Sequence, residues 1–198
     1  MRWLAWLLLP SLGGCVQQAV LENDVQRAQW KSRTLATASV LSLAHAALSA
    51  QLVELEALYQ REPSDPRVRQ LLSHGYQLMA RGFVELRRVD ALAAGDNARA
   101  AREARLRADG EARARYYRGE LGSSARKQER PGFEQALAEA EAACLRHDHA
   151  TYEKELHGLL QAPDVEPERR LEQSLLRQLA SAWLAPNVAA RCAFLKRL

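Results

Sequence analysis

The sequence predicts an all-α protein of antiparallel helical hairpins, arranged as a tetratricopeptide-repeat-like array of about seven helices. Apolar residues recur at intervals of three and four along most of the 198 residues, which is the period of amphipathic helices. Glycine or proline stands at nearly every junction between these stretches. No stretch has the alternation of apolar and polar residues that is typical of a strand. The strict tetratricopeptide consensus is not visible, so the periodicity by itself supports helical hairpins.

Residues 1–14, MRWLAWLLLPSLGG, have the pattern of a signal peptide. Arg2 supplies a positive charge, and the apolar run after it is shorter than the ~20 residues that span a bilayer. The segment ends in Leu-Gly-Gly before Cys15, which resembles the lipobox of bacterial lipoproteins, whose cysteine takes the lipid. An ordinary signal peptide or a chance cysteine is the alternative. Because Val16 follows rather than Asp, the general sorting rule for lipoproteins predicts an outer-membrane protein, lipid-anchored and facing the periplasm.

We expect three segments: the signal peptide at 1–14, a lipid anchor and polar tether at 15–34, and a helical-repeat domain at 35–198. Within the tether, Asn23 and Asp24 are candidates to cap a short helix. The remaining chain is long enough for one domain with a real core.

The first helix of the domain is expected from Leu35 to Tyr59, a stretch without glycine or proline whose leucines and alanines keep a helical period. His45 lies within it. Since no second ligand stands near it in the sequence, we interpret His45 as a histidine at the edge of the core rather than as a metal ligand.

The next helix, within residues 62–86, is the one around which the chain is organised. Asp65 is a good N-cap and Pro66 suits the first turn. Gly75 and Gly82 lie two turns apart on nearly the same face. Glycine inside a helix costs about 1 kcal/mol relative to alanine, so two on one face indicate that a neighbouring helix or a ligand comes close.

Aromatic residues accompany these glycines. Tyr76, Phe83 and Tyr117 could line a groove at the glycine face, although a purely buried helix explains the same pattern. We expect the helix to end near Gly95, with Asp96 capping the next helix after a short connection.

Residues 98–121 are rich in alanine and arginine. Their arginines indicate either a patch for an acidic partner or a solvated face paired with nearby carboxylates. Amphipathic aromatic residues beside arginine are common at binding surfaces, so we single out the end of this helix. The candidate partner-binding residues here are Arg113, Arg115, Tyr117 and Arg118.

A further helix is expected to start after Pro131, another at Asp148, an amphipathic one from Arg169 to Leu184, and a short last one at Pro186.

Cys144, His147 and His149 have a spacing that warrants a test as metal ligands. They offer no fixed fourth ligand, and Asp148 serves equally well as a helix cap, so we expect no metal. In an oxidising compartment, Cys144 and Cys192 form either a disulfide or two buried thiols.

The stretch from about Ala47 to Leu137 resembles the TatT family, lipoproteins associated with some tripartite ATP-independent periplasmic (TRAP) transporters. The matching pieces are ALSAQLVELEALYQREPSDP, LLSHGYQLMARGFVEL, the arginine- and alanine-rich helix ending ARYYRGEL, and RPGFEQAL. After Leu137 the chain departs from the family, whose pattern continues with a Tyr-Trp motif. Here HATYE at 149–153 has the tyrosine without the tryptophan.

The resemblance implies a tetratricopeptide-like fold, a homo-oligomer, and association with a periplasmic solute-binding protein, without catalysis. We therefore expect an adaptor or binding component of a TRAP-type uptake system. The alternative is a structural scaffold that assembles a secretin, a pilus or another envelope complex, because fold does not fix function.

No Ser-His-Asp, Cys-His or glycine-rich phosphate pattern stands in a plausible context, so we expect no enzyme and no cofactor. The formal charge of +4 could indicate nucleic acid. A periplasmic location argues against that partner, and we expect membrane contact through the lipid alone.

Overall fold

The computed structural model describes residues 9–119, 132–163, 167–190 and 192, with side chains from residue 18 onward and, in the helix that begins at residue 132, from residue 135. These residues lie in helices or in the short turns between them, so the expected all-α class is confirmed. The helices are α1 (Leu9–Ala36), α2 (Leu41–Arg61), α3 (Pro66–Leu78), α4 (Glu85–Ala93), α5 (Asn97–Gly119), α6 (Gly132–Arg146), α7 (His149–Gln161), α8 (Arg170–Leu184) and α9 (Pro186–Ala189).

The central rod is formed by α3, a π-helical segment η1 (Met79–Val84) and α4, which follow one another without a break. It starts as predicted: Asp65 Oδ1 accepts a hydrogen bond from the backbone N–H of Arg67 at 2.8 Å, and Pro66 occupies the first turn. It also ends as predicted, because Gly95 has a φ of 79°, a conformation that glycine adopts readily. The backbone N–H of Asp96 then bonds the carbonyl of Ala91, closing a Schellman motif.

The π-helical segment was not predicted. Each π turn carries one more residue than an α-helical turn allows, so the faces before and after η1 are rotated relative to each other. Gly75 consequently faces α2, where an added Cβ would lie 2.9 Å from Leu52 Cδ2. Gly82 faces α8, where it would lie 2.8 Å from Leu175 Cδ1. The expectation that the two glycines share one groove is therefore wrong, and each accommodates a different neighbouring helix.

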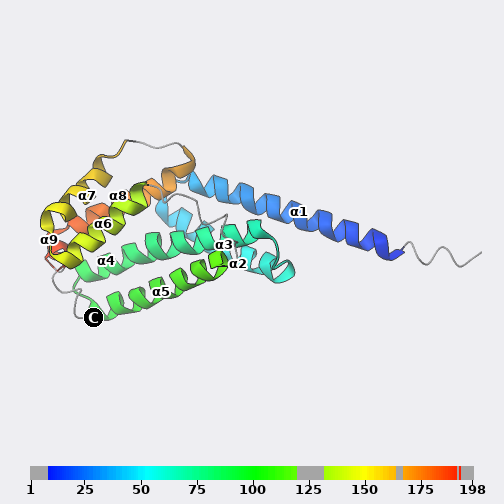
Figure 1. Cartoon of the computed structure of the whole chain (residues 1–198), viewed down its shortest axis with the longest axis horizontal. Coiled ribbons are helices and arrows are strands. Elements are labelled where there is room, and N and C mark those ends of the chain that lie inside the picture. Colours follow the sequence, from blue (N-terminus) through cyan, green and yellow to red (C-terminus); the bar gives the residue numbers. More distant parts are fainter. Residues whose placement is uncertain (1–8, 120–131, 164–166, 191, 193–198) are drawn as a thin grey trace, which may run out of the picture.

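The N-terminal segment also differs from the expectation. α1 is continuous through Asn23 and Asp24, so neither residue caps a helix, and the backbone of residues 15–34 is helical. Val25 and Ala28 are buried because they recur on one face of α1 and pack against α2. The turn at residues 37–40 separates α1 from α2, which begins at Leu41 rather than Leu35. Figure 1 shows the first turns of α1 extending away from the other helices as a rod.

Two large hydrophobic clusters form most of the interior, beside a small third one of Ala91, Leu92 and Ala100. The first joins α1, α2, α3 and the start of α8, and includes Val25, Leu52 and Leu175. The second joins α4, α6, α7, α9 and the rest of α8, and includes Val89 and Leu179. In Figure 1, α4 lies between α5 and the α6–α8 layer. The central rod and α8 thus contribute to both clusters, and they position every site described below.

Candidate functional site

The predicted partner-binding residues are divided between two regions of the molecule. Tyr76 on α3 lies beside Arg113 and Tyr117 on α5, and together with Arg118 they form one cluster with α2, in which the arginines are exposed, Tyr76 is half-buried and Tyr117 is buried. Gly82 and Phe83 lie further along the central rod, in its buried part. Arg115 is exposed and pairs instead with Glu111, at 3.8 Å.

Glu56 of α2 organises the exposed cluster. Its two carboxylate oxygens accept hydrogen bonds from the hydroxyls of Tyr76 and Tyr117, each at 2.7 Å. The two tyrosine rings are stacked, with centroids 6.0 Å apart and an interplanar angle of 11°. Because both hydroxyls are bonded to one carboxylate, the two rings are held in a fixed orientation.

Arg113 covers the outer face of this pair. Its guanidinium carbon lies 5.4 Å from the centroid of the Tyr76 ring, within the range of a cation–π contact. Its Nη1 also donates a hydrogen bond to the Tyr76 hydroxyl at 2.9 Å. The side chain of Arg113 is nevertheless 62% exposed, so most of its hydrogen-bonding capacity faces solvent.

Two further tyrosines complete the cluster. The rings of Tyr59 and Tyr116 both meet Tyr117 edge-on at 5.1 Å, and Tyr116 is 55% exposed. Arg118 is hydrogen-bonded to Gln77 at its edge. We call this area the tyrosine–arginine surface and define it by six residues: Tyr59, Tyr76, Arg113, Tyr116, Tyr117 and Arg118.

The hydroxyls of Tyr76 and Tyr117 act as hydrogen-bond donors to Glu56. Burial, followed by the adjacent Glu56 carboxylate, raises the pKa of both Tyr76 and Tyr117 above the ordinary value. Both side chains therefore stay protonated at neutral pH. The arrangement places aromatic faces beside a guanidinium group.

Phe83 and Gly82 belong to the interior. The Phe83 ring is buried and meets the His45 ring edge-on at 5.1 Å. His45 is half-buried, and its Nε2 lies 3.2 Å from Arg87 Nη1, in agreement with its interpretation as a core-edge residue. Gly82 lies on a cavity of about 60 Å³ whose walls include Leu175 and Leu176 of α8. A volume of this size holds at most a few water molecules.

A buried ion cluster was missed by the sequence analysis. Glu85, at the start of α4, is only 1% exposed. Its carboxylate accepts hydrogen bonds from Arg88 at 2.6 and 2.7 Å and from Arg107 of α5 at 2.8 Å. Arg107 also pairs with Glu111 and with Glu141 of α6, both at 3.2 Å. The available signal was a glutamate embedded in an apolar run, Phe-Val-Glu-Leu, which requires a buried partner.

Arg107 stays charged despite its burial. Burial alone disfavours the charged form of Arg107, but the carboxylates of Glu85, Glu141 and Glu111 outweigh it and raise the pKa of Arg107 above its ordinary value. The cluster therefore joins α4, α5 and α6 through charged hydrogen bonds.

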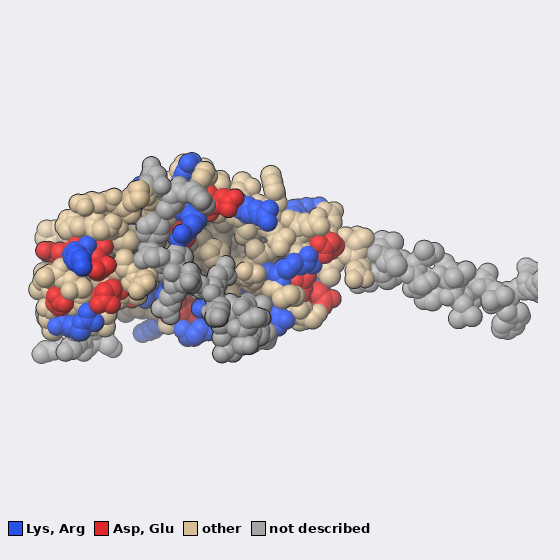
Figure 2. Space-filling model, turned by 45° about the horizontal axis from the view of Figure 1, so that its top comes forward, with Lys and Arg blue, Asp and Glu red and all other residues tan. Residues whose placement is uncertain are grey.

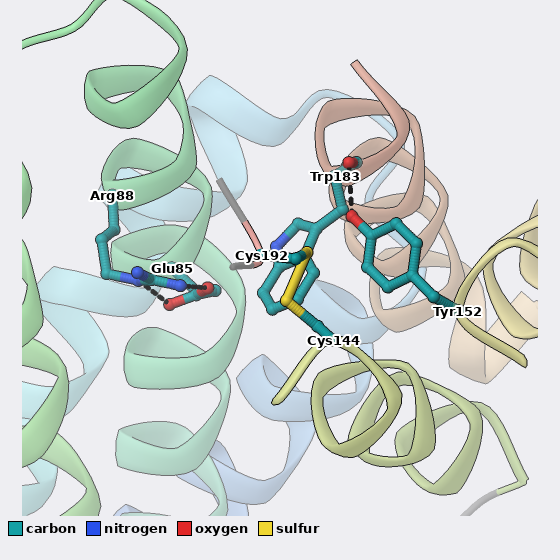
Figure 3. The surroundings of a disulfide bond; sticks show 6 residues. All are labelled: Glu85, Arg88, Cys144, Tyr152, Trp183 and Cys192. Atoms are coloured by element: carbon teal, nitrogen blue, oxygen red, sulfur yellow. Dashed lines mark hydrogen bonds and ion pairs between the residues drawn. A yellow bond between two sulfur atoms is a disulfide. The ribbon is translucent and has the colours of Figure 1, made fainter. Parts of the chain in front are cut away.

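The C-terminal cysteines are bonded to each other. Cys144 at the end of α6 and Cys192 after α9 form a disulfide (Figure 3). Asp148 caps α7, as expected: its Oδ1 accepts a hydrogen bond from the backbone N–H of Thr151 at 3.1 Å. Among the described residues no group of three or more His, Cys, Asp or Glu side chains could hold a metal ion.

The backbone of Cys15 lies within α1, and its side chain is outside the described part of the chain. No helix among the described residues is both long enough and apolar enough to cross a membrane. Figure 2 shows basic and acidic side chains interspersed on the face in view.

Comparison of the chain with protein-family models, with curated proteins and with solved structures found no match.

Proposed function

We propose that this protein is a periplasm-facing, outer-membrane lipoprotein that acts as a binding or adaptor component of a TRAP-type solute uptake system. Its partner is a periplasmic solute-binding protein, which docks on the tyrosine–arginine surface. The lipobox-like sequence before Cys15 supports the location, and the resemblance of residues 47–137 to TatT lipoproteins supports the class of system.

The observation that carries the docking proposal is a group of tyrosines, anchored by the buried Tyr117 and half-buried Tyr76, beside the exposed Tyr116, Arg113 and Arg118. Tyrosine and arginine are enriched in protein–protein interfaces, where large rigid side chains bind with little loss of conformational entropy. Glu56 already holds Tyr76 and Tyr117 in place. Arg113 and Arg118 add positive charge at the edge, which suits an acidic patch on the partner.

Reversing the two edge charges tests the docking surface. In the Arg113→Glu/Arg118→Glu variant we expect capture of the solute-binding protein to fall at least several-fold, because the attraction to an acidic patch becomes repulsion. The measurement is a pull-down of the tagged lipoprotein from solubilised envelopes, with captured proteins identified by mass spectrometry and circular dichroism melts run on the same samples.

The matched control is Arg102→Glu/Arg105→Glu, which makes the same charge change on exposed positions of α5 outside the surface. Equal capture by both folded variants would remove the tyrosine–arginine surface from the proposal. Capture of secretin or pilus components in place of a solute-binding protein would favour the scaffold function instead.

The anchor is tested separately with Cys15→Ser. We expect this variant to remain an unprocessed precursor that no longer incorporates a palmitate analogue, because serine lacks the thiol that takes the lipid. The wild type should label and fractionate with outer membranes. If the serine variant labels and fractionates like the wild type, the lipoprotein assignment is wrong.

A further inference from the structure

The helix α2 is apolar on its outward side as well as on its inward side. The inward side supplies leucines to the core, as expected of an amphipathic helix. On the opposite side, where charged and polar residues normally face water, the central exposed positions carry only leucine, valine or alanine. These positions, which we call the outer stripe of α2, are Leu43, Ala46, Ala50, Val53 and Ala57. Leu43 is 68% exposed and Val53 is 72% exposed. A helix that is apolar all round is normally covered all round.

The distribution of charge also distinguishes this part of the chain. Lys, Arg, Asp and Glu make up 26% of all residues, yet none of them occurs in residues 34–53. The nearest charge beyond this stretch in α2 is Glu54, and Lys31 of α1 already pairs with it at 2.6 Å. Because contiguous exposed apolar residues mark interaction sites, the outer stripe is a candidate contact face.

The spacing of the outer stripe is that of a coiled-coil seam. Its members follow one another at intervals of three, four, three and four residues, a period that allows two helices to pack side by side over several turns. The stripe is also self-complementary. In two antiparallel copies of α2 with a two-fold axis at Ala50, residues equally far from Ala50 on either side lie opposite each other. Leu43 then faces Ala57 of the other copy, and Val53 faces Ala47.

This pairing matches both size and charge. Each of the two large side chains packs on an alanine, which allows the facing side chains to interdigitate. Glu54 faces Ala46 rather than its own copy, so no two like charges are opposed. Lipid is a poorer occupant, because a helix that lies on a membrane carries bulky apolar residues together with Lys or Arg. Three of the five stripe residues are alanine, and residues 34–53 include no basic side chain apart from His45.

We propose that the outer stripe of α2 is the contact face of a two-fold symmetric homodimer, in which two copies of α2 pack antiparallel about Ala50. A helix of 21 residues is about 30 Å long, which makes a small contact compared with standard interfaces. We therefore expect a weak dimer with a micromolar Kd. The proposal assigns a face, a symmetry and a register from α2 alone, and it does not depend on the proposed adaptor function.

Sedimentation equilibrium of the full chain in a mild detergent, at about 1–200 µM, measures this dimer. We expect Ala50→Glu to raise the Kd about tenfold or more, because the two new carboxylates would meet at the axis. The matched control is Ala112→Glu, the same change at an exposed position of α5, which should dimerise like the wild type. Circular dichroism spectra of all samples check that the chains are folded.

Disulfide cross-linking tests the register, with Cys15 replaced by serine in every sample so that the introduced cysteine is the free thiol. Ala50→Cys should form a linked dimer on mild oxidation, since helices about 8–10 Å apart bring Cα atoms at the axis within the ~4.4–6.8 Å that a disulfide spans. Leu43→Cys should not link to itself, because the two copies of position 43 lie roughly 21 Å apart along the helices. It should link to Ala57→Cys when the two variants are mixed.

Three results would overturn the proposal. The first is a wild type that stays monomeric over the whole concentration range, or that forms a trimer or larger assembly. The second is an Ala50→Glu variant that dimerises like the Ala112→Glu control. The third is a Leu43→Cys variant that links to itself as readily as Ala50→Cys, which is the pattern of a parallel pair.

Discussion

Replacement of Glu85 by alanine is expected to lower the free energy of unfolding by about 3–5 kcal/mol, the range measured when one partner of a buried ion pair is removed. The carboxylate of Glu85 is almost fully enclosed and receives hydrogen bonds from Arg88 and Arg107. The side chains of these arginines are only 12% and 23% exposed. Without Glu85, two poorly solvated guanidinium groups would face each other with less compensation.

Equilibrium unfolding in urea, followed by circular dichroism, measures this loss. The matched control is Glu139→Ala, which removes an exposed carboxylate of α6 that pairs with Arg146 at 2.8 Å. Exposed pairs contribute about 0–1 kcal/mol, so the control should remain close to the wild type. Equal effects of the two substitutions would show that Glu85 is solvated in solution, contrary to the structure.

Loss of the disulfide is the second large effect. Cys144 and Cys192 are 48 positions apart in the sequence, and the chain-entropy model gives about 4 kcal/mol for closing a loop of this length. The Cys144→Ala/Cys192→Ala variant should lose stability by about that amount. Alanine is chosen because both sites are buried beside Trp183 and the α6–α7 hairpin, where a serine hydroxyl would add a separate cost.

Thermal or urea unfolding with and without dithiothreitol provides the control. The reductant should destabilise the wild type to the level of the alanine variant and should leave the variant unchanged. A wild type that is insensitive to dithiothreitol, with the variant equally stable, would mean that the cysteines are thiols in the purified protein.

The helix boundaries that local chemistry determines were predictable from the sequence. Asp65 with Pro66, Gly95 with Asp96, and Asp148 each begin or end a helix through bonds to the nearest backbone groups, and such bonds depend only on neighbours in the chain. The start of α1 was not predicted correctly: a short helix was expected to begin at Asn23 or Asp24, whereas one helix runs through both. Only Val25, Ala28 and a few flanking residues of this stretch face α2, and so narrow an apolar stripe is hard to recognise among charged residues.

The candidate sites were predictable only in part. Tyr76, Arg113, Tyr117 and Arg118 were singled out for their chemistry, and the antiparallel packing of α3 and α5 brings them together. The role of Glu56 was not visible in the sequence. Which side of α2 faces Tyr76 and Tyr117 depends on how the helices pack together.

The π-helical segment and the environment of Trp183 were missed for a related reason. The rotation of the helix faces at Met79–Val84 depends on how the rod packs against α5 and α8, which the local sequence does not determine. Among the described residues Trp183 Nε1 is buried without a hydrogen-bond partner, and this depends on every helix around it. Interactions between distant segments thus account for most of what sequence reasoning did not find.

The sharing of two long helices between both hydrophobic clusters has a consequence for how the chain unfolds. Proteins commonly open in contiguous cooperative units, each with its own free energy. Here the rod of α3, η1 and α4 supplies Leu72 to one cluster and Val89 to the other, and α8 supplies Leu175 and Leu179 in the same way. Opening of either cluster removes contacts of these shared helices, so we expect amides in the middle of the rod and of α8 to be among the slowest to exchange with solvent. The first turns of α1 extend away from the other helices (Figure 1), and we expect them to open more easily than the shared helices.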